Sequence, residues 1–172
     1  MFVTFSKAQF EKLNESSVWI IMDPWTDQEK LFPWRLPPNT EPGSLNRWNK
    51  LTMDKILAYL PQMKYPLVVT TEIDKSPEVF QNLPYVQHYP NKAGPVLIER
   101  HMEKHNLKNI IYCGFHENEC IMNRPTGYPK MSERGYDCYI CKDLTAIYPL
   151  IGWKEKVTRT RLSLDYKYFN LI

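Results

Sequence analysis

Short apolar runs alternate with helix-patterned stretches along most of this chain. Each run is rich in valine, isoleucine and tyrosine and is bounded by polar or turn residues, which is typical of a strand buried on both faces. The longest stretch between them repeats apolar residues at helical spacing, at Leu45, Trp48, Leu51 and Ile56. Strands that alternate with helices run parallel, and the helices cover both faces of the sheet. The order therefore predicts an α/β fold with a mostly parallel sheet flanked by helices.

The same pattern places the individual elements. We predict strands at residues 18–22, 66–71, 85–89, 109–113 and 136–141, with a sixth strand over 156–168 at the sheet edge. Helices are predicted at 6–15, with Ser6 as N-cap, at 45–60 and at 96–105. Prolines and a glycine interrupt the stretch after Cys120, so only a short or kinked helix is expected there. The proline- and tryptophan-rich stretch 25–44 has no clean period and predicts a long structured loop.

Composition favours a single domain over residues 1–172, because 43% hydrophobic content at this length can bury a sizeable core. No apolar run reaches the roughly 20 residues of a membrane helix, and the charged start does not resemble a signal peptide. We therefore expect a cytoplasmic protein that does not bind membranes. The net charge of +3 is mild, and the scattered basic residues do not indicate a nucleic-acid partner.

Four cysteines in a chain without an export signal indicate a reducing compartment and free thiols. The pair Cys138 and Cys141 has the spacing of a redox or zinc motif, but both lie inside a predicted strand. At a period of two they point to opposite faces of the sheet. A zinc site that added Cys113 and His116 would need ligands from two strands. We predict two core cysteines and no metal.

Cys120 has the position expected of a nucleophile. The apolar run 110–113 reads as a buried strand, Gly114 breaks it, and Cys120 follows a short polar loop at the start of a helical segment. A helix N-terminus favours negative charge, so it favours the thiolate form of a cysteine. Its free backbone N–H groups can also hold a developing oxyanion.

Residues 114–120, GFHENEC, resemble the nucleophile motif of the isochorismatase-like cysteine hydrolases. One subgroup of that superfamily has a loop that reads roughly G-x-H-T-N-x-C, so His116, Asn118 and Cys120 match, whereas Glu117 replaces the usual threonine. The likeness continues through Arg124-Pro125, Gly127, Met131, Gly135-Tyr136 and Asp143-Leu144-Thr145. It implies the three-layer, Rossmann-like fold of that superfamily, no cofactor, and assembly as a homo-oligomer, either a dimer or a tetramer.

The resemblance also implies a catalytic triad of aspartate, lysine and cysteine, which here are Asp23, Lys92 and Cys120. A thiol nucleophile needs a base to take its proton and a cation to hold the thiolate. The residues alone leave alternatives open: Asp23 can simply cap the turn that follows it, and Lys92 can be an ordinary surface lysine. Lys75 and His88 are the other candidates for the third position.

The loop before Cys120 is expected to hold the oxyanion and contact the substrate. The resemblance assigns the oxyanion to the backbone N–H groups of His116 and Cys120, and it implies a cis peptide bond between Phe115 and His116. Glu117 lies in the same loop. Asn118 can bind substrate or cap the helix, and capping is the favoured role.

An aromatic wall of the substrate pocket is a further expectation. Trp25 heads the candidates, which also include Phe32, Trp34 and Tyr128, although each can serve simple packing instead. The stretch between Pro24 and Tyr65 contains no histidine, which argues against the metal site that the nicotinamidases of this superfamily carry.

These observations predict a cysteine-dependent hydrolase of a small amide, ureido or carbamoyl compound, acting through an acyl-thioester. The alternative is a catalytically inactive relative of the same fold that serves as a binding or scaffolding protein. A thiol-redox protein is a third and weaker interpretation.

Overall fold

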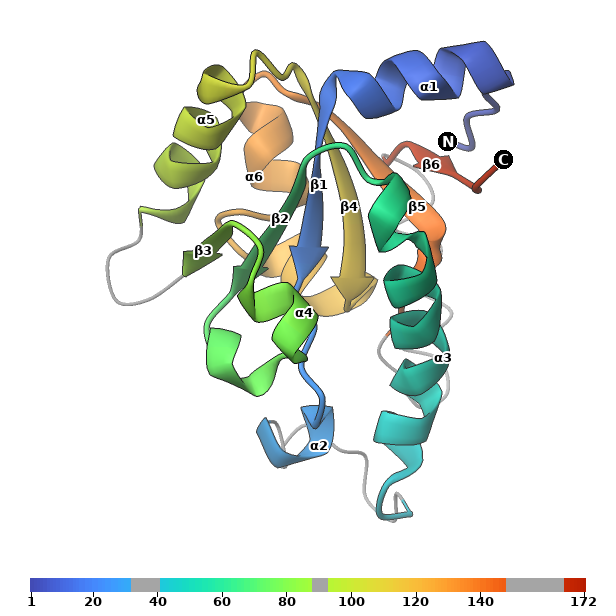
Figure 1. Ribbon diagram of the computed structural model, residues 1–172, viewed down its shortest axis with the longest axis vertical. Coiled ribbons are helices and arrows are strands. Elements are labelled where there is room, and N and C mark those ends of the chain that lie inside the picture. Colours follow the sequence, from blue (N-terminus) through green and yellow to red (C-terminus); the bar gives the residue numbers. More distant parts are fainter. Residues whose placement is uncertain (32–40, 88–92, 148–165) are drawn as a thin grey trace.

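The computed structural model describes residues 1–31, 41–87, 93–147 and 166–172. Its strands form one six-stranded sheet in the order β3-β2-β1-β4-β5-β6, and every neighbouring pair is parallel (Figure 1). The strands are β1 (Ser17–Met22), β2 (Pro66–Thr70), β3 (Tyr85–Gln87), β4 (Asn109–Phe115), β5 (Asp137–Ala146) and β6 (Tyr168–Phe169). The predicted mostly parallel sheet is confirmed.

Helices cover both faces of this sheet (Figure 1). The α-helices are α1 (Lys7–Glu15), α2 (Gln28–Leu31), α3 (Ser44–Tyr59), α4 (Glu78–Gln81), α5 (Gly94–Lys104) and α6 (Tyr128–Glu133). Two 3-10 turns, η2 (Leu60–Gln62) and η3 (Ile73–Lys75), and a π-helical turn, η4 (Glu117–Ile121), complete the described elements. The short helix predicted after Cys120 is confirmed as η4 and α6, which Pro125 and Gly127 separate.

The first helix begins where its sequence predicts. Ser6 is the N-cap: its hydroxyl accepts a hydrogen bond from the backbone N–H of Gln9 at 3.2 Å, and the Gln9 side chain accepts one from the Ser6 N–H at 2.8 Å. This capping box satisfies two backbone donors that the helix cannot. At the other end of the chain, the strand predicted over 156–168 falls mostly outside the described residues, and β6 begins at Tyr168.

Two cores lie on opposite faces of the sheet, and β1 contributes to both. Ile20 faces the core that α5 and α6 cover, whereas Trp19 and Ile21 face the core under α1 and α3. β5 also contributes to both cores, since Cys138 lies in the core under α5 and α6 and Cys141 lies in the core under α1 and α3. The prediction that these two cysteines point to opposite faces is therefore confirmed. Burial raises the pKa of each thiol to about 12.

The strand order creates one topological switch point. From β1 the chain moves outward through β2 and β3, then returns to place β4 on the other side of β1. In open α/β sheets, ligands bind at the carboxyl ends of the strands where the order reverses. Gly114 lets β1 and β4 approach closely there: its φ is +102°, and a Cβ would lie 2.4 Å from the carbonyl oxygen of Met22.

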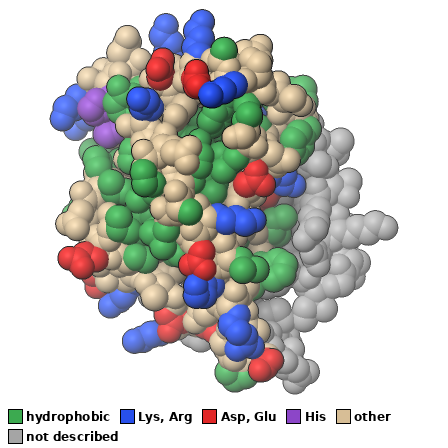
Figure 2. All heavy atoms as spheres, turned by 45° about the vertical axis from the view of Figure 1, so that its right-hand side comes forward, with side chains coloured by type: hydrophobic (Ala, Val, Ile, Leu, Met, Phe, Trp, Pro, Cys, Tyr) green, Lys and Arg blue, Asp and Glu red, His purple; other side chains and the backbone are tan. Residues whose placement is uncertain are grey.

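The surface carries charges of both signs. On the face shown in Figure 2, lysine and arginine side chains alternate with acidic ones, and hydrophobic side chains gather between them. Trp48 and Leu51, both on α3, are among the most exposed large hydrophobic side chains in the described part of the chain. Within that part, no helix combines the length and apolar character needed to cross a membrane.

Candidate active site

Asp23 is the first residue after β1 and lies at the switch point. Its φ of +42° is in the left-handed region, which a non-glycine residue rarely adopts. The neighbouring backbone holds this turn: the Asp23 carbonyl accepts hydrogen bonds from the Trp25 N–H at 2.7 Å and from the Gln28 side chain at 2.9 Å. The residue is fully buried, so its carboxyl depends on protein groups for partners.

Arg124 supplies the principal partner of that carboxyl. Its Nη1 donates to Asp23 Oδ1 at 3.1 Å and its Nη2 lies 2.7 Å from Oδ2, a two-point contact between planar groups. The Arg124 side chain is 16% exposed, so the ion pair is shielded from water. The guanidinium also lies 6.0 Å from the centroid of the Trp25 ring. Arg124 belongs to the stretch that carries the family likeness, but no role was predicted for it.

Burial raises the pKa of Asp23 from 3.8 to about 6. The Arg124 charge opposes this rise, and so do hydrogen bonds to the side chains of Cys120 and Thr70. The Cys120 hydrogen bond is the central observation, because it brings together two residues that lie almost a hundred positions apart. The structure thus joins the predicted base and the predicted nucleophile at one place.

Cys120 is held on the first helical turn after β4. It belongs to η4. At the start of this turn, the His116 carbonyl accepts hydrogen bonds from the N–H groups of Glu119 and Ile121, each at 3.2 Å. The cis peptide bond between Phe115 and His116 that the resemblance implied is present. The side chain of Cys120 is largely buried, with 7% of the residue exposed.

Four residues lie between the strand and Cys120: His116, Glu117 and Asn118 are buried, and Glu119 is partly exposed. His116 Nε2 lies 2.9 Å from Asn49 Oδ1 on α3. Glu117 accepts a hydrogen bond from the Tyr168 hydroxyl on β6. Burial, together with this contact, raises the pKa of Tyr168 well above its ordinary value. The prediction that Asn118 caps the helix is wrong: His116 takes the cap position, because the helical turn begins one residue before Asn118.

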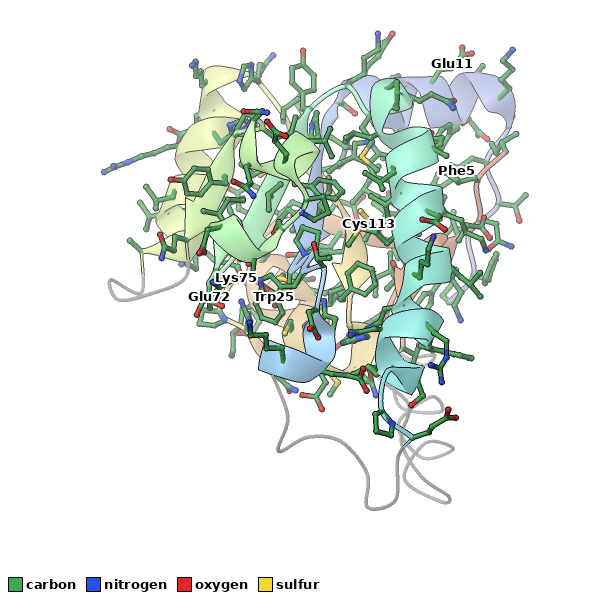
Figure 3. All side chains as sticks on the ribbon, turned by 60° about the horizontal axis from the view of Figure 1, so that its bottom comes forward. Phe5, Glu11, Trp25, Glu72, Lys75 and Cys113 are labelled. Carbon is green, nitrogen blue, oxygen red and sulfur yellow. The ribbon has the colours of Figure 1, made fainter. Side chains whose placement is uncertain are left out.

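The predicted third member of the triad, Lys92, lies outside the described residues, and so do His88, Phe32 and Trp34. Lys75 follows β2, and its ammonium group pairs with Asp74 at 3.2 Å with the side chain half-exposed. Figure 3 shows Lys75 at the same end of the molecule as Trp25. In the described part of the chain, Arg124 is the cation paired with Asp23.

Trp25 lines a cavity of about 390 Å³ beside α3, and its role in the wall of a substrate pocket stays a prediction. Its indole N–H donates to Thr70 Oγ1 at 2.8 Å, which fixes the ring. Tyr128 behaves differently: it is buried in the core on the α6 side and stacks on Tyr166 with the ring centroids 4.3 Å apart. It packs the core, which is the alternative that the sequence left open for it. Among the described residues, no cluster of three His, Cys, Asp or Glu side chains can hold a metal.

Solved structures with the same architecture were found by comparison. YcaC from Pseudomonas aeruginosa, solved with hexane-2,5-diol and covalent acrylamide, is 15% identical over 91% of this chain and 77% of its own, with a TM-score of 0.56. YcaC from Escherichia coli, described as an octameric hydrolase of unknown specificity, is 16% identical over 91% and 76%, with a TM-score of 0.53. An isochorismatase family protein from Burkholderia thailandensis is 8% identical over 92% and 93%, with a TM-score of 0.57.

No protein-family model and no curated protein sequence matches the chain. At these low identities the structural likeness establishes the fold, and it confirms the fold class that the sequence predicted.

Proposed function

We propose that this chain, which has the isochorismatase-like fold, is a cysteine-dependent hydrolase of a small amide, ureido or carbamoyl compound. The observation that carries the proposal is the hydrogen bond between the Cys120 thiol and the buried Asp23 carboxyl, which also forms an ion pair with Arg124. A nucleophile, a base and a group that orients the base are the parts that covalent catalysis requires.

The raised pKa of Asp23 suits it to act as the base. A free thiol has a pKa near 8.5, so a carboxylate of ordinary pKa takes its proton at a large energetic cost. Raising the carboxyl pKa to about 6 lowers that cost by about 3 kcal/mol, at 1.36 kcal/mol for each pKa unit. Burial of Asp23 therefore serves the chemistry.

In the proposed reaction, Cys120 Sγ attacks the carbonyl carbon while its proton moves to Asp23. The tetrahedral intermediate collapses, the C–N bond breaks, and Asp23 returns the proton to the leaving amine. Water then attacks the acyl-thioester and gives one proton to Asp23, and that proton returns to the departing thiolate. The net change is the addition of one water across the C–N bond.

The resemblance assigns the oxyanion to the backbone N–H groups of His116 and Cys120, and we retain that assignment within the proposal. Arg124 keeps the Asp23 carboxylate oriented between proton transfers. We keep Lys92 as a second cation of the site on the ground of the resemblance. Glu117 and Asn118, buried beside Cys120, shape the loop on the substrate side.

The structural neighbours add support of a coarser kind. YcaC from Escherichia coli, an octameric hydrolase, and the isochorismatase family protein from Burkholderia thailandensis both share this fold. We accordingly propose a homo-oligomer that acts on a small-molecule substrate.

The test is the rate at which iodoacetamide alkylates each cysteine, followed by peptide mass spectrometry. We expect fast labelling of Cys120 and slow labelling of Cys113, Cys138 and Cys141, because burial raises the pKa of these three thiols. The Cys120→Ala variant should lose all turnover of small amides while its melting temperature stays near that of the wild type. If Cys120 reacts no faster than the other three, the inactive binding or scaffolding relative becomes the better interpretation.

A further inference from the structure

Thr70, the last residue of β2, lies beside Asp23 at the switch point. Met22 pairs with Val69 across β1 and β2, and the Asp23 N–H donates to the Val69 carbonyl at 3.0 Å. Val68 faces the core under α1 and α3, so Thr70, two residues further on, points to the same side of the sheet. The residue is fully buried. Its hydroxyl therefore depends on protein groups for partners, and three of them are among the described residues.

Two of these partners are N–H groups. The Trp25 indole N–H donates to Thr70 Oγ1 at 2.8 Å, and the Glu72 backbone N–H donates to the same oxygen at 3.2 Å. Trp25 and Glu72 lie at the same end of the molecule (Figure 3). A hydroxyl oxygen has two acceptor positions and one hydrogen. The two N–H groups therefore fill both acceptor positions, and only the hydrogen of the hydroxyl is left to bind a further group.

The third partner is the Asp23 carboxyl, which forms a hydrogen bond with the Thr70 side chain. Because both acceptor positions of the hydroxyl are occupied, Thr70 is the donor in this bond and the carboxylate oxygen accepts. A donor of this kind stabilises the ionised carboxylate and offers no acceptor to the protonated acid. The direction of the bond is thus set by Trp25 and Glu72.

The other groups that act on Asp23 do so differently. Among the described residues, the charged and titratable side chains that act on it are Arg124 and Cys120, and the Thr71 backbone N–H is a further donor. Arg124 contacts both carboxylate oxygens and brings a full positive charge. Thr70 is neutral, so it orients the carboxylate without adding charge to the site.

We propose that Thr70 is a positioning residue for Asp23: with two N–H groups on its oxygen, its hydroxyl holds the carboxylate as an acceptor and connects it to the Trp25 ring. This inference deepens the proposed function, on which it rests for the role of Asp23 as the base. Thr70 cannot accept the proton that Asp23 takes from Cys120. That proton therefore has no partner on the Thr70 side and stays available to the leaving amine.

The first test is the titration of the Asp23 carboxyl itself, followed by the ¹³C chemical shift of its carboxyl carbon from pH 4 to 9. This readout requires no catalysis. The wild type should titrate near pH 6. Thr70→Val keeps the shape of the side chain and removes the hydroxyl, so Asp23 should titrate about one pH unit higher, because its ionised form loses a donor. Thr70→Ser keeps the hydroxyl and should titrate as the wild type does.

Trp25→Phe tests the direction of the bond, and it decides the question if Thr70→Val fails to fold. Phenylalanine keeps an aromatic ring beside Arg124, which lies 6.0 Å from the Trp25 centroid, and removes the indole N–H. One acceptor position of Thr70 is then open. The hydroxyl can turn and accept from the protonated acid, which should move the titration of Asp23 up by roughly half a pH unit.

Thr145→Val is the matched control for loss of a buried threonine hydroxyl. The Thr145 hydroxyl donates to the Cys141 carbonyl at 2.7 Å, so its removal should leave the titration of Asp23 in place. An unchanged titration in Thr70→Val or in Trp25→Phe would overturn the proposal. So would a rise in Thr70→Ser or Thr145→Val equal to that in Thr70→Val.

The alkylation rate of Cys120 by iodoacetamide connects this result to the proposed function. At pH 6 it should fall about fivefold in Thr70→Val, as the ionised fraction of Asp23 drops from about one-half to about one-tenth. If the carboxyl titrates as expected and the alkylation rate does not follow it, the role of Asp23 as the base fails. The role of Thr70 in holding the carboxylate would stand.

Discussion

Replacement of Arg124 by methionine is the most direct test of how the site works. Methionine keeps an unbranched stem of similar reach and removes the charge, so the carboxyl of Asp23 stays buried without its cation. An opposite charge at such a distance lowers a carboxyl pKa by about 1 to 3. The Asp23 pKa is about 6 with Arg124 in place, so we expect it at roughly 7 to 9 without Arg124.

This change has a measurable effect on the thiol. At pH 7 the ionised fraction of Asp23 should fall from about nine-tenths to between roughly one-half and one-hundredth. Alkylation of Cys120 by iodoacetamide requires the ionised carboxylate in our scheme. The rate at pH 7 should therefore drop by about 2- to 100-fold, and it should recover at higher pH.

The assay is the alkylation rate of Cys120 measured from pH 5 to 9. The wild type should show an inflection near pH 6, and Arg124→Met should show it above pH 7. Arg134→Met is the matched control, because Arg134 also makes a two-point contact, with Glu99 at 2.7 Å for each bond, but at the surface. An inflection that stays at the wild-type pH in Arg124→Met would refute the role of Asp23 as the base.

Two further predictions concern stability. The folded-state pKa of Asp23 lies above its ordinary value, so the stability that it contributes is full below about pH 3.8 and is lost as the pH rises through about 6, a total of about 3 kcal/mol. In Asp23→Asn, the unfolding free energy from urea titrations should therefore fall less between pH 4 and 7, by about this amount. If the unfolding free energy of Asp23→Asn depends on pH as in the wild type, the raised pKa of Asp23 is contradicted. Gly114→Ala should lower the free energy of unfolding by on the order of 3 kcal/mol or more, because the added Cβ meets the Met22 backbone. Gly135→Ala, at φ +96° with open space around it, should lower it by about 1 kcal/mol. Equal melting temperatures for the two variants would show that the close approach of β1 and β4 does not make Gly114 more sensitive to substitution.

The sheet was predictable because its signal is local. A strand buried on both faces needs an uninterrupted apolar run, and such runs mark β1, β2 and β4 in the sequence. The end of β5 was missed because Lys142 and Asp143 are polar and indicated a stop. The strand continues to Ala146, since the register shift between Tyr112 and Gly114 lets the chain pass these residues and pair again at Thr145.

The site was predictable only in part. Asp23 and Cys120 were singled out because each follows a buried strand and because the resemblance gives both a catalytic role. Parallel strands bring such residues to one edge of the sheet. The role of Arg124 depends on how the chain turns after η4, which no local pattern specifies. The available signal was its spacing: Arg124 lies four residues after Cys120, and residues four apart in a helical segment share a face.

The cost of Asp23 to the fold supports the proposed role of this residue as a base. The residue combines a left-handed backbone conformation, complete burial and a carboxyl whose ionised form is disfavoured at neutral pH. Each of these features opposes folding, and an asparagine or glycine at this position would relieve one or more of them. Arg124 and the Cys120 thiol offset only part of the cost, because the pKa remains near 6 with both in place. A structural role would be better served by a residue without this penalty, whereas a base that must accept a proton from a thiol needs it.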